Sequence, residues 1–209
     1  MIQVLIADDH PIIRQGLKQI LAEAGDISVI GEFATGHDVL IAIRKKSFDA
    51  VVMDLSMPGG GLDLVKHIRE EKPNLPILVL SVHSEEHYAV RALKAGASGY
   101  LTKGSAPDLL VSALRKLAEG GRYITPSLAE KLALDLQSPV AGKSTREALS
   151  DREYQILRLL GQGKAHGDIA KHLNLSPKTV STYRARILEK TGLKSTAELI
   201  RYAIDQGAE

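Results

Sequence analysis

The sequence contains no cysteine, which excludes disulfide bonds and thiolate metal sites. It also has no uninterrupted apolar run near the roughly 18 residues that a membrane-spanning helix requires. The apolar run at its start, in MIQVLIADDH, ends after a few residues at two aspartates and is too short for a secretory signal peptide. We therefore expect a cytoplasmic protein with no membrane partner.

Charge is spread unevenly along the 209 residues, although the net charge is only +2. Residues 1–120 carry 13 basic and 15 acidic side chains, a balance of −2, and residues 121–209 carry 14 and 10, a balance of +4. An acidic first part and a basic second part suggest two domains, the second of which acts on nucleic acid. Solvated faces often show imbalances of this size, so charge alone does not establish the point.

The first 120 residues alternate short apolar runs with segments in which apolar residues recur every three or four positions. Continuous apolar runs are typical of strands buried on both faces of a parallel sheet, and the segments between them have the period of helices. The five runs are Val4–Ala7, Val29–Ile30, Val51–Met53, Ile77–Leu80 and Gly99–Leu101. They predict an α/β domain with a doubly wound five-stranded parallel sheet.

The rest of the chain carries helix signals only. We expect a linker with a short helix over 121–147, in which SPVAGKST forms a loop. Residues 148–209 predict a small all-α domain of four helices, at roughly 150–161, 166–173, 177–191 and 195–206, with capping boxes and an early proline at their starts. Three residues separate the second helix from the third, which is short enough for a helix-turn-helix.

Charged and polar side chains stand where four of the predicted strands end. Asp8 and Asp9 follow the first strand, Asp54 the third, and Ser81 and Lys103 mark the fourth and fifth. The carboxyl ends of parallel strands meet at one edge, where carboxylates raise one another's pKa unless a cation neutralises them. Oxygen ligands of this kind suit Mg²⁺, so we predict a site for phosphoryl chemistry. Taken singly, each acid would more often be a turn or helix cap and Lys103 a solvated lysine.

These residues resemble the receiver domain of two-component response regulators, and the resemblance covers all of residues 1–120. It rests on the acidic pair, on Asp54 followed by Met57-Pro58, on Ser81, and on Tyr100 before Lys103. It implies the strand order 2-1-3-4-5 and a phosphoryl group that Asp54 accepts from a phosphohistidine of a sensor histidine kinase. It also implies Mg²⁺ binding by Asp8, Asp9, Asp54 and the backbone carbonyl of Ser56, and a switch formed by Ser81, Tyr100 and Lys103. Such a receiver is not a general enzyme and catalyses only its own phosphoryl transfer and dephosphorylation.

Two rival interpretations do not fit the residues, and a third stays open. A nucleotide-binding loop would need a glycine-rich turn with a Lys-Ser/Thr pair where the chain reads ADDHP. Phosphatases with an aspartyl nucleophile place a second acid where this chain has Ser56. A regulator that leaves the pocket unused in vivo is still possible.

Receivers commonly read Met-Pro-x-x-x-Gly-Leu where this chain has MPGGGL, which is one residue shorter. We expect an ordered loop with positive φ at one or more of its glycines.

The third helix of the second domain, PKTVSTYRARILEKT, is basic and amphipathic, with Val180 and Ile187 on its inward stripe. Its place after a short helix and turn favours a recognition helix in the DNA major groove, where Arg184, Arg186 and Lys190 would contact phosphates or guanine edges. The alternative is a helical bundle whose basic face meets only water.

The stretch from LSDREY to LIRYAI resembles the LuxR-type DNA-binding domain without gaps, so the whole chain resembles the NarL/FixJ class of response regulators. The resemblance implies double-stranded DNA as a partner and a homodimer on activation. Its DNA contacts would be Lys178, Thr179, Ser181, Thr182, Arg184, Ala185, Arg186 and Lys190. Its dimer surface would be Leu199, Ile200, Ala203 and Ile204, which could instead pack inside their own domain. The family often has lysine at position 181 and histidine at 183, so its base contacts cannot be transferred to this chain.

Overall fold

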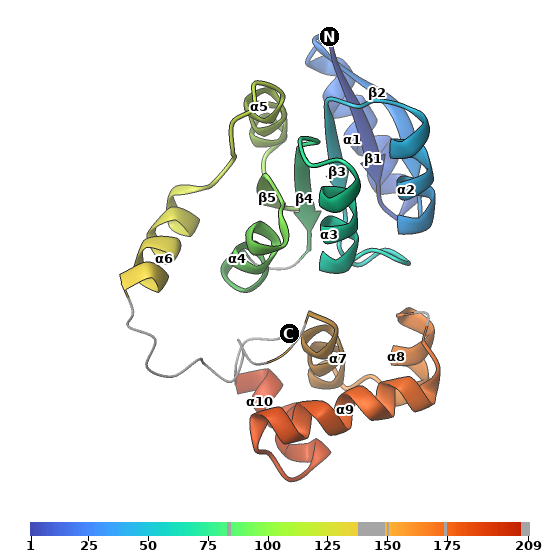
Figure 1. The fold of residues 1–209 in the computed structure, drawn as a ribbon, viewed down its shortest axis with the longest axis vertical. Coiled ribbons are helices and arrows are strands. Elements are labelled where there is room, and N and C mark those ends of the chain that lie inside the picture. Colours follow the sequence, from blue (N-terminus) through green and yellow to red (C-terminus); the bar gives the residue numbers. More distant parts are fainter. Residues whose placement is uncertain (83–84, 138–148, 150, 174, 206–209) are drawn as a thin grey trace. The chain divides into compact units, whose positions relative to one another are not determined.

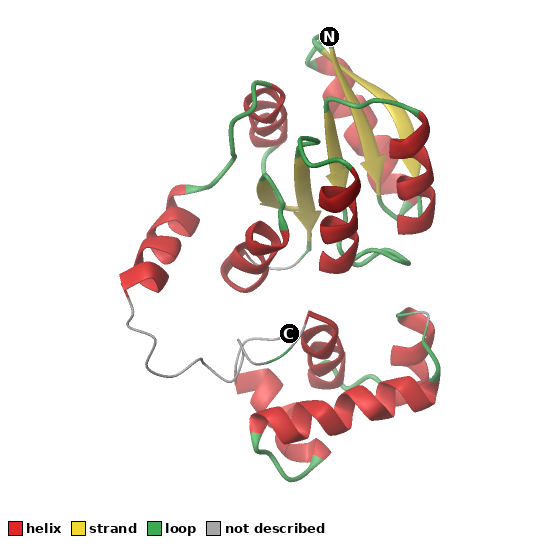
Figure 2. Ribbon diagram, in the orientation of Figure 1, coloured by secondary structure: helices red, strands yellow, loops and turns green. Residues whose placement is uncertain are grey.

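The chain forms two compact units, residues 1–137 and 138–209, in the computed structural model (Figure 1). The structure describes residues 1–82, 85–137, 149, 151–173 and 175–205. Strands occur in the first unit, and the described part of the second is helical (Figure 2). None of the helices described is both long and apolar enough to cross a membrane.

The first unit is built around a parallel sheet with the strand order β2-β1-β3-β4-β5 (Figure 2). The strands are β1 (Ile2–Ala7), β2 (Ile27–Phe33), β3 (Ala50–Met53), β4 (Ile77–Ser81) and β5 (Gly99–Thr102). Every residue of β3 and β4 is buried, as their continuous apolar runs predict. The predicted fold class and strand order are confirmed. In register, Met53 pairs with both Ala7 and Val79, so the ends of β1 and β3 lie side by side.

Helices cover both faces of this sheet (Figure 1). They are α1 (Pro11–Glu23), α2 (Gly36–Lys45), α3 (Leu62–Glu71), α4 (Glu85–Ala95) and α5 (Pro107–Ala118). Leu17 and Leu21 of α1 join Leu114 and Leu117 of α5 in one apolar cluster on the sheet. On the other face α3 packs beside both α2 and α4. Burial of the apolar stripe of each helix is what holds these layers together.

Residues 121–137 cluster with the first unit. The Tyr123 N–H donates to the Ser98 carbonyl at 3.0 Å, and Tyr123 forms a bridge with Gly99 of β5. Helix α6 (Pro126–Gln137) then packs against α4. The contacts therefore extend past the boundary expected at 120, because the partly buried Tyr123 ring joins the core. The expected loop over SPVAGKST lies outside the described residues.

The second unit contains α7 (Asp151–Gly161), α8 (His166–His172), α9 (Pro177–Thr191) and α10 (Thr196–Asp205). These bounds agree with the four predicted helices to within one or two residues. Helix α9 begins as expected, since Ser176 Oγ accepts the Thr179 N–H at 3.1 Å and Pro177 takes the first helical position. It ends at Gly192, whose φ of +71° is the left-handed conformation that favours glycine. Val180, Ile187 and Leu199 are fully buried in the core of this unit.

Candidate functional site

Two buried aspartates and a lysine meet at the carboxyl edge of the sheet. Asp8 directly follows β1, Asp54 directly follows β3 and Lys103 directly follows β5. Lys103 Nζ lies 2.5 Å from Asp8 Oδ2 and 3.3 Å from Asp54 Oδ2, and all three side chains are nearly excluded from solvent. The Asp54 N–H donates to the Ala7 carbonyl at 2.8 Å, which ties the loop after β3 to the end of β1. The sequence predicted this meeting, and the structure brings these residues together.

Burial raises the pKa of the Asp54 carboxyl above its ordinary value, and Asp8 raises it further. The Lys103 ammonium and the Ser56 N–H, which donates to Asp54, act in the opposite direction but do not cancel the effect of burial. The net result is a carboxylate that is poorly solvated when ionised. A cation or an electrophile beside Asp54 would therefore offset the unfavourable desolvation of the ionised Asp54 carboxylate in the folded protein.

His10 and Arg14 also belong to this edge, although the sequence reasoning did not single them out. His10 Nδ1 lies 3.2 Å from Asp8 Oδ1 and 2.8 Å from Asp9 Oδ1, and Arg14 Nη1 donates to the Asp8 carbonyl at 2.6 Å. Asp8, Asp9 and His10 offer ligand atoms close enough to share one cation. The signal that could have found His10 is its place directly after the acidic pair and before Pro11, which starts α1.

Asp54 Oδ1 is buried at this edge without a hydrogen bond, and the buried Asp9 Oδ1 faces the His10 Nδ1 atom at 2.8 Å. Buried carboxylate oxygens in proteins normally accept hydrogen bonds or bind cations. Oxygen donors from three aspartates, with the Ser56 carbonyl two residues after Asp54, are the donor set that Mg²⁺ prefers. The residues present thus fit a divalent cation.

The predicted switch residues lie on the neighbouring strands. Ser81 ends β4 and is fully buried, and its carbonyl accepts the Lys103 N–H at 2.8 Å. Tyr100 lies on β5 opposite Val79 and is also fully buried, the largest such side chain among the described residues. Tyr100 is therefore more deeply buried than an ordinary half-buried aromatic of a sheet. Residues 83 and 84, in the connection between β4 and α4, lie outside the described residues.

The glycine loop after β3 has the conformation that the sequence predicted. Gly59 and Gly61 have φ of +66° and +83°, and the Gly60 N–H donates to the Met57 carbonyl at 2.9 Å. Gly61 directly precedes α3, so the shortened loop runs straight into a helix. The Gly36 N–H, at the start of α2, donates to the Pro58 carbonyl at 2.9 Å. This contact joins the β2–α2 connection to the loop that carries Asp54 and Ser56.

Replacing Gly36 by alanine should destabilise the first unit. A Cβ at Gly36 would lie 2.0 Å from the Gly59 carbonyl oxygen, a backbone atom that cannot move without shifting the loop. Overpacking of this kind costs roughly 1–3 kcal/mol, which calorimetry of the full chain would detect as a lower melting temperature. Gly16→Ala is the matched control, because a Cβ there meets nothing within 4 Å on a helix, where alanine is favoured. Equal melting temperatures for the two variants would contradict the prediction.

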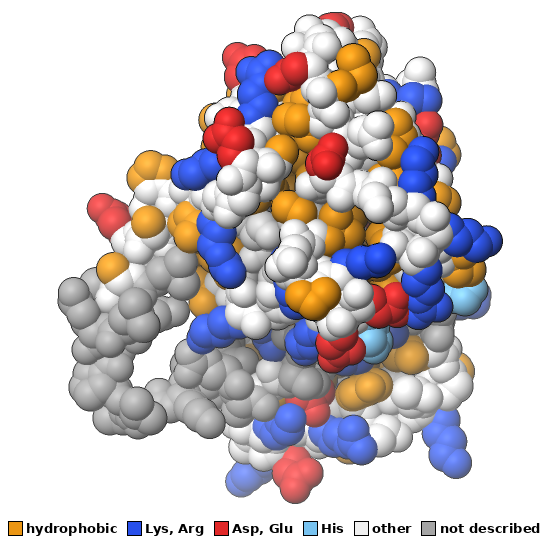
Figure 3. All heavy atoms as spheres, turned by 45° about the horizontal axis from the view of Figure 1, so that its top comes forward, with side chains coloured by type: hydrophobic (Ala, Val, Ile, Leu, Met, Phe, Trp, Pro, Cys, Tyr) orange, Lys and Arg blue, Asp and Glu red, His pale blue; other side chains and the backbone are white. Residues whose placement is uncertain are grey.

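Helix α9 exposes six of its eight predicted DNA-contact residues, and these are Lys178, Ser181, Thr182, Ala185, Arg186 and Lys190. Three of the eight have partners within the unit. Thr179 is half-buried beside Ser176, and Arg184 Nη1 donates to Thr196 Oγ1 at 3.1 Å. Lys190 Nζ lies 2.7 Å from Oε2 of the buried Glu153 on α7. Basic and acidic side chains are interspersed over the face of the molecule drawn in Figure 3.

Two of the four predicted dimer residues face the inside of their own unit. Leu199 and Ala203 are fully buried, and α10 packs so closely on α7 that a Cβ at Gly161 would lie 2.7 Å from the Ala203 Cβ. Ile200 is partly buried against the same core, and Ile204 is 47% exposed. For Leu199 and Ala203 the structure shows the packing inside their own domain that the sequence left open as the alternative. The side of α10 that carries Leu199 and Ala203 completes the core of its unit, and Ile204 remains available to a partner.

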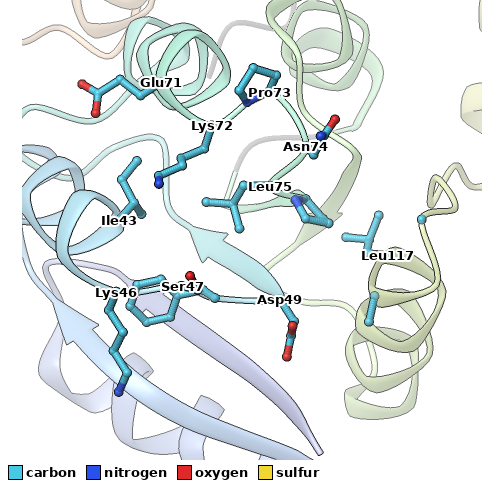
Figure 4. Close-up of a pocket in the computed structure, with 14 residues that line it drawn as sticks. Ile43, Lys46, Ser47, Asp49, Glu71, Lys72, Pro73, Asn74, Leu75 and Leu117 are labelled. Carbon is cyan, nitrogen blue, oxygen red and sulfur yellow. The ribbon is translucent and has the colours of Figure 1, made fainter.

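The first unit also has a cavity of about 450 Å³, which lies away from Asp8, Asp54 and Lys103 (Figure 4). Its walls come from the connections before β3 and β4 and from the end of α5, and include Phe48, Leu75 and Leu117. The strands begin at this edge, whereas Asp8, Asp54 and Lys103 stand where strands end. No predicted site residue lines the cavity.

Comparison with known proteins matches both units to described families. Residues 4–115 match the response regulator receiver domain, and residues 147–203 match the luxR family of bacterial regulatory proteins. Response regulator UvrY of Escherichia coli K12 is 40% identical over 208 residues, which cover 99% of this chain and 95% of UvrY. RcsB of Salmonella enterica serovar Typhimurium, bound to promoter rprA with the phosphomimetic BeF3⁻, superposes with a TM-score of 0.68 at 31% identity, covering 97% of this chain and 98% of that one. A structure of two RcsB dimers bound to two parallel DNAs gives a TM-score of 0.59 at 31% identity, with 96% of each chain covered.

Proposed function

Because the chain belongs to the response regulators that join a receiver domain to a LuxR-type DNA-binding domain, we propose that Asp54 is the residue whose phosphorylation controls it. The protein is a phosphorylation-controlled transcription regulator. The observation that carries the assignment of Asp54 is its buried carboxylate with one oxygen free of hydrogen bonds beside the Lys103 ammonium.

In the proposed transfer, an Asp54 oxygen attacks the phosphorus of a phosphohistidine on a sensor histidine kinase. The new bond joins that oxygen to phosphorus, the phosphorus–nitrogen bond breaks, and its electron pair leaves with the imidazole nitrogen. Lys103 stabilises the charge that spreads over the phosphoryl oxygens, since its Nζ already lies 3.3 Å from Asp54 Oδ2. The Ser81 hydroxyl, at the adjoining strand end, would donate a hydrogen bond to a phosphoryl oxygen.

Asp8, Asp9, Asp54 and the Ser56 backbone carbonyl would hold Mg²⁺. When bound, the ion neutralises phosphoryl charge as a hard cation. The chain's own contribution is to keep these oxygens together: the Ala7 carbonyl fixes the Asp54 backbone, and Arg14 and His10 fix Asp8. Dephosphorylation in the same pocket would be the only other reaction of the receiver.

Phosphorylation would favour one of two receiver conformations, to the extent that the phosphoryl group binds them differently. Ser81 and Tyr100 are the proposed switch, and the full burial of Tyr100 supports a role that depends on packing. The second unit would then bind double-stranded DNA as a homodimer in the cytoplasm, with Ile204 at the dimer surface. The dimers and promoter complexes of RcsB support this proposal.

Loading the full chain with Mg²⁺ and BeF3⁻ should strengthen its binding to duplex sites selected from a random library. Arg186→Ala should weaken that binding and lower the slope of log Kd against log salt by about one, because one phosphate contact is lost. Lys94→Ala, which removes an exposed charge from the first unit, is the control and should change neither quantity. Electrophoretic titrations at several salt concentrations measure both. Equal binding with and without the phosphoryl mimic would favour a phosphorylation-independent regulator.

A further inference from the structure

Helix α9 presents one row of exposed side chains that recur at the spacing of a single helix face, and from the start of the helix these are Lys178, Thr182, Ala185 and Glu189. Val180 and Ile187, on the opposite side, are fully buried. The row therefore points directly away from the core of its unit. On a helix that enters the major groove, such a row is the part that lies nearest to the base edges.

The hydroxyl group in this row donates its proton inside the helix. Thr182 Oγ1 donates to the Lys178 carbonyl at 3.1 Å, and the neighbouring Ser181 Oγ donates to the Pro177 carbonyl at 3.1 Å. Neither hydroxyl keeps a proton for a base acceptor. What Thr182 and Ala185 offer outward is one methyl group each.

Arg186 stands to the side of this row rather than in it. Its guanidinium lies over the Tyr183 ring, 5.9 Å from the centroid, and Tyr183 itself packs against the core. A guanidinium held toward the flank of the helix suits a phosphate rather than a base edge. The small Ala185 leaves the middle of the row without a long side chain, so the helix backbone can approach the groove closely.

From these contacts we infer that the helix reads thymine through methyl–methyl contacts, with Thr182 and Ala185 each facing the C5-methyl group of a thymine in the major groove. The two residues are three positions apart, less than one helical turn, so the thymines lie close together in one half-site. This inference rests on the proposed DNA-binding function. It deepens that function by naming the chemical group that is recognised.

The test replaces thymine by deoxyuridine, which removes only the C5-methyl group, one position at a time in the selected duplex. For the full chain, deoxyuridine at one or two positions of each half-site should weaken binding about fourfold, the effect of one buried methyl group. The measured quantity is the ratio of Kd for the deoxyuridine and thymine duplexes. Because each protein variant is compared with itself, any change in its stability or general affinity cancels.

Ala185→Gly should bring this ratio to one at one thymine, and Thr182→Ser, which keeps the hydroxyl, should do so at the other. Thr191→Ser is the matched control, since Thr191 bonds the Ile187 carbonyl in the same way but lies on the inward half of α9; its ratios should equal those of the unchanged chain. A full chain that tolerates deoxyuridine everywhere, or variants that keep every ratio, would overturn the inference while DNA binding stands. Failure to bind any duplex would instead refute the proposed function.

Discussion

A chain with Asp54→Asn should take up no phosphoryl group from a small phosphodonor such as acetyl phosphate, while it stays folded. The asparagine side chain has no carboxylate oxygen to form the acyl phosphate bond, and Asp8, the buried acid beside it, is held by Lys103 and His10. Intact-protein mass spectrometry measures the uptake directly. Asp63→Asn, at an exposed aspartate of α3, is the control and should be phosphorylated like the unchanged chain.

The same variant should melt at an equal or higher temperature than the unchanged chain. The pKa of Asp54 is raised in the folded state, chiefly by burial, so ionised Asp54 disfavours folding at pH values above that pKa. A neutral amide of similar size removes this cost, and Lys103 keeps its pair with Asp8. Uptake by the variant equal to that of the unchanged chain would show that another residue accepts the phosphoryl group. If the variant took up no phosphoryl group but also melted at a much lower temperature, the result would show only that the pocket had unfolded.

The sequence was enough to predict that Asp8, Asp54 and Lys103 meet at one edge of the sheet, because each stands directly after a strand. Each of Asp8, Asp54 and Lys103 follows an apolar strand, and parallel strands end at one edge, so topology alone brings the side chains together. The positive φ values of Gly59 and Gly61 follow in the same way from glycine's conformational freedom in a short loop. These predictions needed the strand order but no knowledge of packing.

Packing decided the features that the sequence could not predict. Leu199 and Ala203 have the spacing of an apolar outer stripe as much as of an inner one, and only the fit of α10 against Gly161 places them inside. The attachment of residues 121–137 depends on Tyr123 reaching β5, which no local pattern signals. The sequence predicts that Lys190 contacts DNA, because its ion-pair partner Glu153 lies 37 positions earlier and only the folded structure brings the two side chains together.

Replacing Lys190 by methionine should therefore destabilise the second unit rather than act first on DNA. Glu153 is 2% exposed, and its carboxylate would lose the ammonium that lies 2.7 Å away. Removing one partner of a fully buried ion pair costs about 3–5 kcal/mol. Because Lys190 is 39% exposed, water can replace part of the interaction, and we expect about 1–3 kcal/mol. Calorimetry of the full chain would show a lower melting temperature for the transition of this unit.

Two comparisons separate this structural role from a DNA contact. Adding Glu153→Gln to Lys190→Met removes the carboxylate charge that has lost its Lys190 partner, so the double variant should recover part of the lost stability, as a double-mutant cycle would show. Lys178→Met changes an exposed lysine of the same helix. It should change the free energy of unfolding by no more than about 0.5 kcal/mol while weakening DNA binding. If Lys190→Met instead left stability unchanged and lowered the salt dependence of DNA binding, Lys190 would be a phosphate contact. The ion pair with Glu153 would then be a weak interaction of the DNA-free protein, and a DNA phosphate would replace Glu153 as the partner of Lys190.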